Sequence, residues 1–294
     1  MGIGRLCRLL GISRQCFYQC GWRQEDISVQ QQLILQQVRT IRVLHRCLGT
    51  RKLYVLLQPF LLEHQIKIGR DALFDLLSAY GLLVRKRRRR IATTQSWHQL
   101  HKYPDLTGGL TLSGINQLWV SDITYHKLTT QQWAYISFVS DAYSHKILGY
   151  QVAPTLETLY CKAALQMALR HAELSAEDKL IHHSDRGLQY CSGQYVQLLQ
   201  QHHIAISMTQ SGDPRENAIA ERINGIMKQE YLNHHHFHSL QQLQEALEQA
   251  VWLYNYQRPH MSCSMLAPAI VHAQQLPVSR QWKNYYAKRQ APGT

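Results

Sequence analysis

Residues 180–189, LIHHSDRGLQ, combine a short apolar strand with an acidic side chain at its end. Leu180 and Ile181 predict the strand, Asp185 follows it, and the Arg–Gly pair after the acid predicts a turn. In open α/β sheets, ligand and metal sites lie where strands end. Asp185 is therefore a candidate site residue, and its partners have to come from other parts of the chain.

Two further acids lie in ordered segments on either side of this stretch. Asp122 interrupts residues 118–125, LWVSDITY, which are rich in β-forming residues and apolar on both faces, as in a central strand. Glu221 lies on a helix predicted over residues 211–231, opposite the isoleucines that would pack on the sheet. A buried carboxylate is costly unless it is paired or bound to a cation. We therefore expect Asp122, Asp185 and Glu221 to meet at one sheet edge as the catalytic residues.

The same helix carries a polar stripe beside Glu221. Asn217, Asn224 and Lys228 fall on the face of the acid when successive residues turn by about 100°. Such a stripe is either a solvated surface or, if the acids converge, a contact with DNA, and we assign the three residues to DNA binding. His183 is either a further DNA contact or an ordinary strand-end histidine.

The order of the predicted elements over residues 116–275 favours an α/β fold. Three strands come first, and the short connection between the second and the third predicts an antiparallel hairpin. The predicted strands are 118–125, 132–140, 146–152, 180–181 and 204–208, and the predicted helices are 157–173, 192–201, 211–231 and 240–256. This order resembles the ribonuclease H-like fold, a mixed five-stranded sheet flanked by helices.

Three converging carboxylates suit hard divalent cations. Oxygen ligands select Mg²⁺ or Mn²⁺. Two such ions about 4 Å apart activate an attacking oxygen and stabilise the leaving oxygen in phosphoryl displacement. We therefore expect Asp122, Asp185 and Glu221 to bind two Mg²⁺ or Mn²⁺ ions.

The charge of the chain points to a polyanionic partner. Its 294 residues include 32 Lys and Arg against 19 Asp and Glu, a formal net charge of +13, which favours nucleic acid as the partner over a basic protein without a polyanionic partner. No apolar run reaches the roughly 18 residues of a membrane span, so we expect no membrane partner. Seven cysteines without a C-x-x-C pair fit a reducing compartment. We expect a cytoplasmic protein.

Residues 1–92 predict a small helical domain, which is either of DNA-binding type or a packing module. Two short helices around residues 11–13, with Ser13 as N-cap, resemble the centre of a helix-turn-helix. Further helices are predicted over 29–48, 51–62 and 69–80.

Six consecutive cations end this helical domain. They are Arg85, Lys86, Arg87, Arg88, Arg89 and Arg90. Because like charges repel, the run cannot pack in a core, and it either follows DNA phosphates or stays solvated. We assign it to DNA binding, and we expect a linker over residues 93–115 and a basic tail over 276–294.

Three blocks around the acids resemble the insertion sequence three family of transposases, which have a retroviral-integrase-like catalytic core. The blocks are WVSDITY around Asp122, HHSDRGLQY around Asp185 and ENAIAERINGIMKQE around Glu221. As in that family, 35 residues separate the second Asp from the Glu, and a basic residue, Lys228, follows the Glu by seven positions. Residues 254–268, YNYQRPHMSCSMLAP, resemble the Y-N-x-x-R-P-H block of the family.

The resemblance implies metal-dependent cleavage and joining of DNA strands at the ends of an insertion sequence, without a covalent protein–DNA intermediate. The expected partner is double-stranded DNA, as element ends and as target, and the expected location is the bacterial nucleoid. It also implies a homo-oligomer in the synaptic complex, and an upstream-frame protein with a helix-turn-helix as a further partner. Two other functions stay open. One is a truncated or regulatory DNA-binding protein that occupies element ends without catalysis, and the other is a nuclease that cleaves RNA–DNA hybrids without joining.

Overall fold

The chain folds into two units. The structure, a computed structural model, describes residues 3–84, 100–172, 174, 179–210 and 214–278. Residues Met1–Lys86 form a helical unit, and Arg87–Thr294 form a larger unit built on a sheet. The cations predicted at 85–90 and most of the predicted basic tail lie outside the described residues. No helix in the described ranges is long and apolar enough to cross a membrane.

The helical unit contains α1 (Ile3–Leu9), α2 (Arg14–Leu44), α3 (Thr50–Glu63) and α4 (Arg70–Ala79). As expected, Ser13 caps α2, and its side chain accepts a 3.0 Å hydrogen bond from the Cys16 backbone N–H. The second and third predicted helices are in fact one continuous helix, α2. Residues 19–28 contain no proline, and the single Gly21 costs about 1 kcal/mol relative to alanine, too little to end a helix.

The larger unit is built on five strands in the order β3-β2-β1-β4-β5. The strands are β1 (Leu118–Lys127), β2 (Trp133–Asp141), β3 (Ile147–Ala153), β4 (Ile181–Ser184) and β5 (Ala205–Met208). The pairs β1–β2 and β2–β3 are antiparallel, whereas β1–β4 and β4–β5 are parallel. This mixed sheet confirms the predicted fold class. The parallel pairing of β4 with β1 brings the end of β4, which Asp185 follows, beside Asp122.

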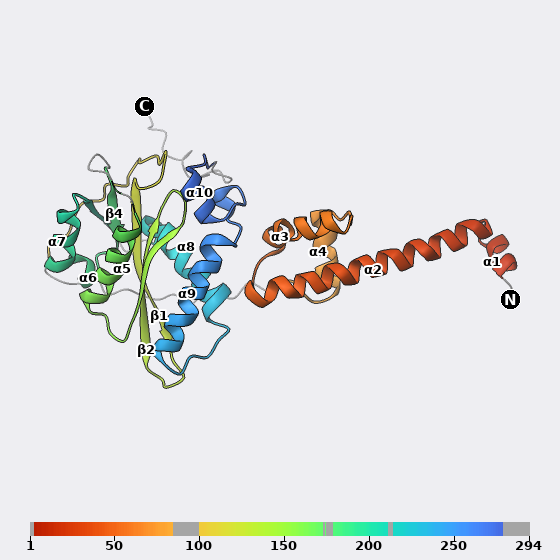
Figure 1. The fold of residues 1–294 in the computed structure, drawn as a ribbon, viewed down its shortest axis with the longest axis horizontal. Coiled ribbons are helices and arrows are strands. Elements are labelled where there is room, and N and C mark those ends of the chain that lie inside the picture. The colour runs from red at the N-terminus through yellow and green to blue at the C-terminus, as the bar shows by residue number, and fades with distance from the viewer. Residues whose placement is uncertain (1–2, 85–99, 173, 175–178, 211–213, 279–294) are drawn as a thin grey trace, which may run out of the picture. The chain divides into compact units, whose positions relative to one another are not determined.

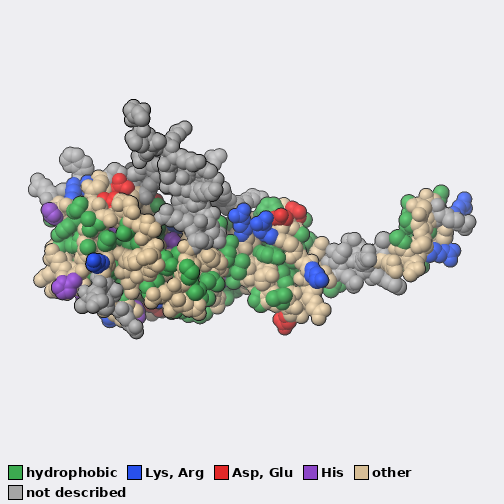
Figure 2. Space-filling view, turned by 90° about the horizontal axis from the view of Figure 1, so that it is seen from above, with side chains coloured by type: hydrophobic (Ala, Val, Ile, Leu, Met, Phe, Trp, Pro, Cys, Tyr) green, Lys and Arg blue, Asp and Glu red, His purple; other side chains and the backbone are tan. Residues whose placement is uncertain are grey.

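Helices cover both faces of this sheet (Figure 1). One face is covered by α5 (Thr158–His171), α6 (Leu188–Cys191) and α7 (Gly193–Gln201), and the other by α8 (Ala218–Ile226) and α9 (Leu240–Tyr256), on which α10 (Pro268–Gln274) packs. Helix α5 lies very close to β3, and Gly149 permits this approach: a Cβ atom at this position would be 2.0 Å from the Ala164 carbonyl oxygen. On the face drawn in Figure 2, acidic side chains are sparse.

The segment predicted as one regular helix over residues 211–231 changes its geometry twice. A 3-10 turn, η1 (Pro214–Asn217), leads into α8, and a π-helical turn, η2 (Met227–Leu232), follows. The wide turn is visible in the hydrogen bond of 2.8 Å from the Asn233 N–H to the Lys228 carbonyl, five residues earlier. π-turns are rare and recur at functional sites, and this one contains Lys228.

The described part of the predicted linker packs on the sheet unit. Leu106 N–H donates to Ser207 Oγ at 2.8 Å, and the Pro104 carbonyl accepts from Met208 N–H at 3.3 Å. These contacts attach residues 103–107 to the edge strand β5, so this segment is part of the sheet unit and does not act only as a connection.

Candidate active site

Asp122 lies in the middle of β1, partly buried against α8. Its Oδ1 accepts a 2.8 Å hydrogen bond from the Ile123 backbone N–H, and its Oδ2 accepts one of 2.8 Å from Asn224 Nδ2. Both oxygens therefore have a defined orientation. The strand forms because residues 118–125 are rich in β-formers, and its ladder with β2, in which Asp122 pairs with Phe138, holds the acid in place.

The other two acids approach Asp122 from different elements. Asp185 follows β4, and its Oδ1 accepts a 3.0 Å hydrogen bond from the Gly187 N–H. Glu221 lies in the first turn of α8 and is exposed. Burial raises the pKa of Asp122 to about 7, the negative charge of Asp185 adds to this rise, and Glu221 adds a smaller contribution, while the two hydrogen bonds oppose it. The three predicted catalytic acids are therefore electrostatic neighbours.

The carboxylates of Asp122, Asp185 and Glu221 fit divalent cations in their chemistry, although their side chains are not arranged as a complete metal site. In the part of the chain that the structure describes, no group of three His, Cys, Asp or Glu side chains is already gathered for a metal. Burial is the main cause of the raised pKa of Asp122, and repulsion by Asp185 and Glu221 adds to it; a cation among the carboxylates would relieve that repulsion. Carboxylate oxygens are also the ligands that Mg²⁺ and Mn²⁺ prefer.

Two of the amides predicted to contact DNA turn towards the sheet. Asn217 Nδ2 donates to the Ser121 carbonyl at 2.9 Å, and Asn224 Nδ2 donates to Asp122 Oδ2 at 2.8 Å. Each residue is only 7% exposed. The two amides therefore fix η1 and α8 against β1, at the Ser121 carbonyl and the Asp122 carboxylate. Contact of either residue with DNA stays a prediction.

Lys228 lies on the π-turn, close to the acids. Its Nζ is 4.2 Å from the ring centroid of Tyr125, three residues after Asp122 on β1. Partial burial lowers the pKa of Lys228, and the carboxylate of Asp122 opposes that change. The lysine therefore lies within electrostatic reach of the candidate catalytic centre, as its predicted contact with a phosphate requires.

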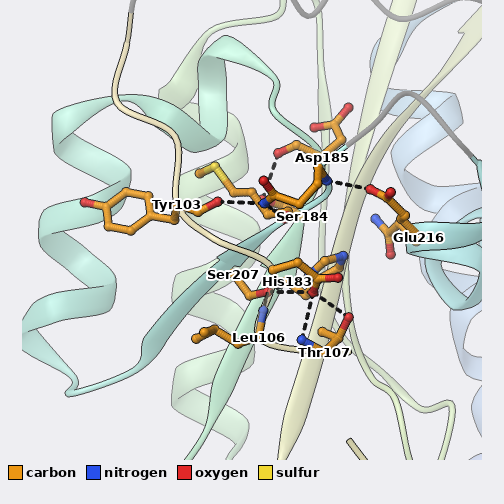
Figure 3. A network of polar contacts seen from close by, with 12 residues as sticks. Tyr103, Leu106, Thr107, His183, Ser184, Asp185, Ser207 and Glu216 are labelled. Atoms are coloured by element: carbon orange, nitrogen blue, oxygen red, sulfur yellow. Dashed lines mark hydrogen bonds and ion pairs between the residues drawn. The ribbon is translucent and has the colours of Figure 1, made fainter. Parts of the chain in front are cut away.

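His183 belongs to a buried polar network below Asp185 (Figure 3). It is 1% exposed, and its Nδ1 lies 2.8 Å from Ser207 Oγ and 3.8 Å from Asp105 Oδ1. Asp105 in turn accepts hydrogen bonds of 2.7 and 2.6 Å from the N–H and hydroxyl of Thr107. Burial lowers the pKa of His183, and Asp105 opposes this. In this structure, His183 ties β4 to β5 and to residues 103–107, and its contact with a phosphate stays a prediction.

The C-terminal block holds the π-turn and the β2–β3 hairpin in place. Arg258, which is fully buried, makes two hydrogen bonds of 2.7 Å to the Glu230 carboxylate on η2. Asn255 binds both backbone groups of Ile147, at 3.0 and 2.9 Å, and Tyr254 donates to the His145 carbonyl at 3.0 Å. The Y-N-x-x-R-P-H block therefore acts on the site from a distance, through the elements that it fixes.

Sequence reasoning missed Asp105, the pairing of Arg258 with Glu230, and the inward turn of the two amides. Asp105 carries no signal, because it lies in a polar stretch that predicts a linker. Arg258 and Glu230 are 28 positions apart, and no local pattern pairs them. The helical spacing of Asn217, Glu221 and Asn224 predicts that they share one face of the helix. Spacing alone does not predict which side of that face packs against the sheet.

Comparison with known proteins identifies relatives across most of the chain. Two families described as Integrase core domain match residues 113–214 and 202–268. An insertion element IS600 protein of 31 kDa from Shigella sonnei is 33% identical over 270 residues, which is 90% of this chain and 96% of the relative. The transposase for insertion sequence element IS629 from Shigella sonnei is 30% identical over 77% of this chain and 76% of its own length.

Two further proteins are similar over about half of the chain. Transposase InsF for insertion sequence IS3A from Escherichia coli K12 is 34% identical over 53% of this chain and 54% of its own length. Among solved structures, the HTLV-2 integrase catalytic core domain in complex with magnesium is 20% identical, covers 53% of this chain and 96% of that chain, and has a TM-score of 0.42. At that score the likeness adds nothing to what the strand order already shows.

Proposed function

The chain belongs to the insertion sequence three family of transposases, whose catalytic part is an integrase core, and from that premise we propose which residues carry its chemistry. It is a DNA transposase, a polynucleotidyl transferase that hydrolyses phosphodiester bonds at the ends of an insertion sequence and transfers the freed strands to other DNA. We assign catalysis and cation binding to Asp122, Asp185 and Glu221.

The three acids have different tasks in this proposal. Asp122 is the fixed member, because a backbone N–H and the Asn224 amide orient its oxygens. Asp185 and Glu221 complete the oxygen donor set from the end of β4 and from α8. Two Mg²⁺ or Mn²⁺ ions, when bound, supply activation of the attacking oxygen and stabilisation of the leaving oxygen. The protein contributes three negative charges that hold the ions and a rigid sheet that positions them.

The proposed contacts with DNA are made by cationic side chains. Lys228 binds a phosphate of the processed strand next to Asp122, and the six cations from Arg85 to Arg90 follow the backbone of the duplex. Because two element ends must be joined in one reaction, the active form is a homo-oligomer. An upstream-frame protein adds end recognition. The substrate places this activity at the nucleoid, in the cytoplasm.

The observation that carries the proposal is that Asp185 and Glu221, 63 and 99 positions away in sequence, act electrostatically on Asp122, adding to the rise in its pKa that burial causes first. The test is a cleavage and strand-transfer assay with Mg²⁺ and duplexes copied from the ends of the element. We expect cleavage and joining by the unmodified chain, and neither reaction by the Asp122→Asn or Glu221→Gln variant. Binding without chemistry would indicate the regulatory alternative. Cleavage of RNA–DNA hybrid without joining would indicate a ribonuclease.

A further inference from the structure

Two large aromatic side chains lie exposed beside the candidate active site. Tyr125 on β1 is 41% exposed and Trp133 on β2 is 46% exposed. The antiparallel register pairs Tyr125 with Tyr135 and Lys127 with Trp133, so all four side chains lie on one face of the two-stranded ribbon. The Tyr125 and Trp133 rings are 5.3 Å apart between centroids, with their planes at 84°. They form a corner with aromatic surface open to solvent, which we call the aromatic corner.

Each ring of the aromatic corner has a lysine over it. Lys228 Nζ is 4.2 Å from the Tyr125 centroid, and Lys127 Nζ is 5.8 Å from the Trp133 centroid. Both distances fall within the roughly 6 Å range of cation–π contacts. Aromatic faces interleaved with cations are the surface that binds single-stranded nucleic acid, because bases stack on the rings and phosphates meet the charges.

The aromatic corner lies near the acids, but on the other face of the sheet. Asp122 and Tyr125 are three residues apart on one strand, about 10 Å at the usual rise, and their side chains point to opposite faces because side chains alternate along a strand. Lys228 connects the two places, since it covers Tyr125 and also interacts electrostatically with Asp122.

We propose that the aromatic corner formed by Tyr125 and Trp133 binds an unpaired base of the DNA strand next to the one that is cleaved. The base stacks on one ring and meets the edge of the other, and Lys127 and Lys228 hold the adjoining phosphates. Stacking tolerates every base, so the corner selects for an opened duplex end and not for sequence. The inference rests on the proposed function, because it takes DNA to be the substrate.

A second exposed aromatic pair provides a matched control. Trp252 and Tyr256 on α9 are 50% and 54% exposed, with ring centroids 6.0 Å apart. Glu248 lies one helical turn before Trp252 and is exposed, so the nearest charge on this helix repels phosphate. If exposed aromatic area alone attracted DNA, both pairs would act equally. If charge and position also matter, only the aromatic corner binds DNA.

The test is a binding titration of the full chain without divalent cation, in EDTA. Two probes are used, a blunt duplex and the same duplex with a short single-stranded end that carries 2-aminopurine, a base whose fluorescence falls when it stacks. The variants are Trp133→Ala, Tyr125→Ala, their Phe counterparts and Trp252→Ala. Circular dichroism and thermal unfolding confirm that each variant folds.

We expect Trp133→Ala and Tyr125→Ala to bind the open-ended probe about 5- to 100-fold more weakly and to abolish its quenching, with about 2-fold or less change for the blunt duplex. The Phe variants should keep most of the quenching, and Trp252→Ala should behave as the unmodified chain. Equal weakening for both probes, or none, would overturn the inference. So would unchanged quenching with an altered oligomeric state, because that result assigns the corner to a protein contact. This test measures only binding and fluorescence. Its result can therefore be interpreted even if the catalytic assay of the proposed function fails.

Discussion

The Asn224 amide on α8 donates a 2.8 Å hydrogen bond to Oδ2 of Asp122 on β1. This bond joins the helix that carries one candidate metal ligand to the strand that carries another. Burial raises the pKa of the Asp122 carboxyl, and the hydrogen bond from Asn224 lowers it. Asn224 therefore favours the charged form of Asp122, which is the form that binds cations. The residue is thus a positioning residue for the metal ligands.

Replacing Asn224 with alanine should therefore weaken Mg²⁺ dependence more than DNA binding. Loss of a hydrogen bond to a metal-ligating carboxylate typically costs about 10- to 100-fold in metal affinity or activity. We expect the Mg²⁺ concentration for half-maximal cleavage to rise by that factor, and the acidic limb of the rate–pH profile to move to higher pH. Asn217→Ala is the control, since Asn217 binds the Ser121 carbonyl and not the carboxylate. Equal shifts of the acidic limb in both variants would contradict a specific role for Asn224.

The raised pKa of Asp122 predicts how stability depends on pH. The pKa is about 7 in the folded chain without cation and about 4 in an unfolded chain, so the folded state holds this proton more tightly. Above about pH 4 the unfolded chain releases the proton first, and the free energy of unfolding therefore falls as the pH rises towards about 7. Below about pH 4 both the folded and the unfolded chain hold the proton, so Asp122 no longer makes the free energy of unfolding depend on pH.

Urea unfolding in EDTA across that pH window, with Asp122→Asn as reference, isolates this effect from the buried histidines. We expect the variant to gain stability relative to the unmodified chain as the pH rises, by at most about 4 kcal/mol for a shift of this size. Mg²⁺ should reduce the difference, because it relieves the repulsion among the acids. A difference that does not vary with pH would show that Asp122 has an ordinary pKa.

The buried ion pair between Arg258 and Glu230 predicts a large effect on stability. Their side chains are 0% and 15% exposed, so removal of the arginine leaves a largely buried carboxylate without its cation. Such losses typically cost about 3–5 kcal/mol. We expect Arg258→Met to lower the free energy of unfolding by that amount, and the addition of Glu230→Gln to recover part of it. Arg258→Lys should fall in between, since lysine cannot make both hydrogen bonds in the same geometry. A loss below about 1 kcal/mol for Arg258→Met would contradict the role of the pair.

The close approach of α5 to β3 predicts a destabilising glycine substitution. A Cβ at Gly149 would lie 2.0 Å from the Ala164 carbonyl oxygen, and the helix would have to move. We expect Gly149→Ala to cost about 1–3 kcal/mol in the free energy of unfolding, as overpacking typically does. Gly193→Ala, on α7, is the matched control, because its Cβ would meet nothing within 4 Å. It should be neutral or stabilise by up to about 1 kcal/mol. Similar unfolding midpoints for both variants would show that α5 adapts.

The sheet could be predicted from sequence because its strands carry their own signals. The β-formers of 118–125 became β1, the two runs after them, joined by a short connection, became β2 and β3, and the short stretches at 180–181 and 204–208 became β4 and β5. The fold class and the family follow from that order and from the spacing of the three acids. Patterns of this kind are local and repeat at the period of the secondary structure.

The features that sequence did not predict depend on contacts between distant residues. The π-turn within the predicted regular helix lies where Arg258 binds Glu230, 28 positions away. The same limitation applies to Asp105, which joins the His183 network only because residues 103–107 fold back along β5. Helical spacing placed Asn217 and Asn224 on one stripe, but only the packed structure turns their amides inwards.

The most direct test of the central claim is single-turnover cleavage of element-end DNA by Asp185→Asn in Mg²⁺. The amide keeps the shape of the carboxylate and removes its charge. We predict a loss of rate of roughly 1,000-fold or more, with DNA affinity in EDTA changed by less than about 2-fold. Glu245→Gln, an exposed acid on α9, should cleave normally. Cleavage by Asp185→Asn at the unmodified rate would contradict the assignment of Asp122, Asp185 and Glu221 as the cation-binding catalytic residues.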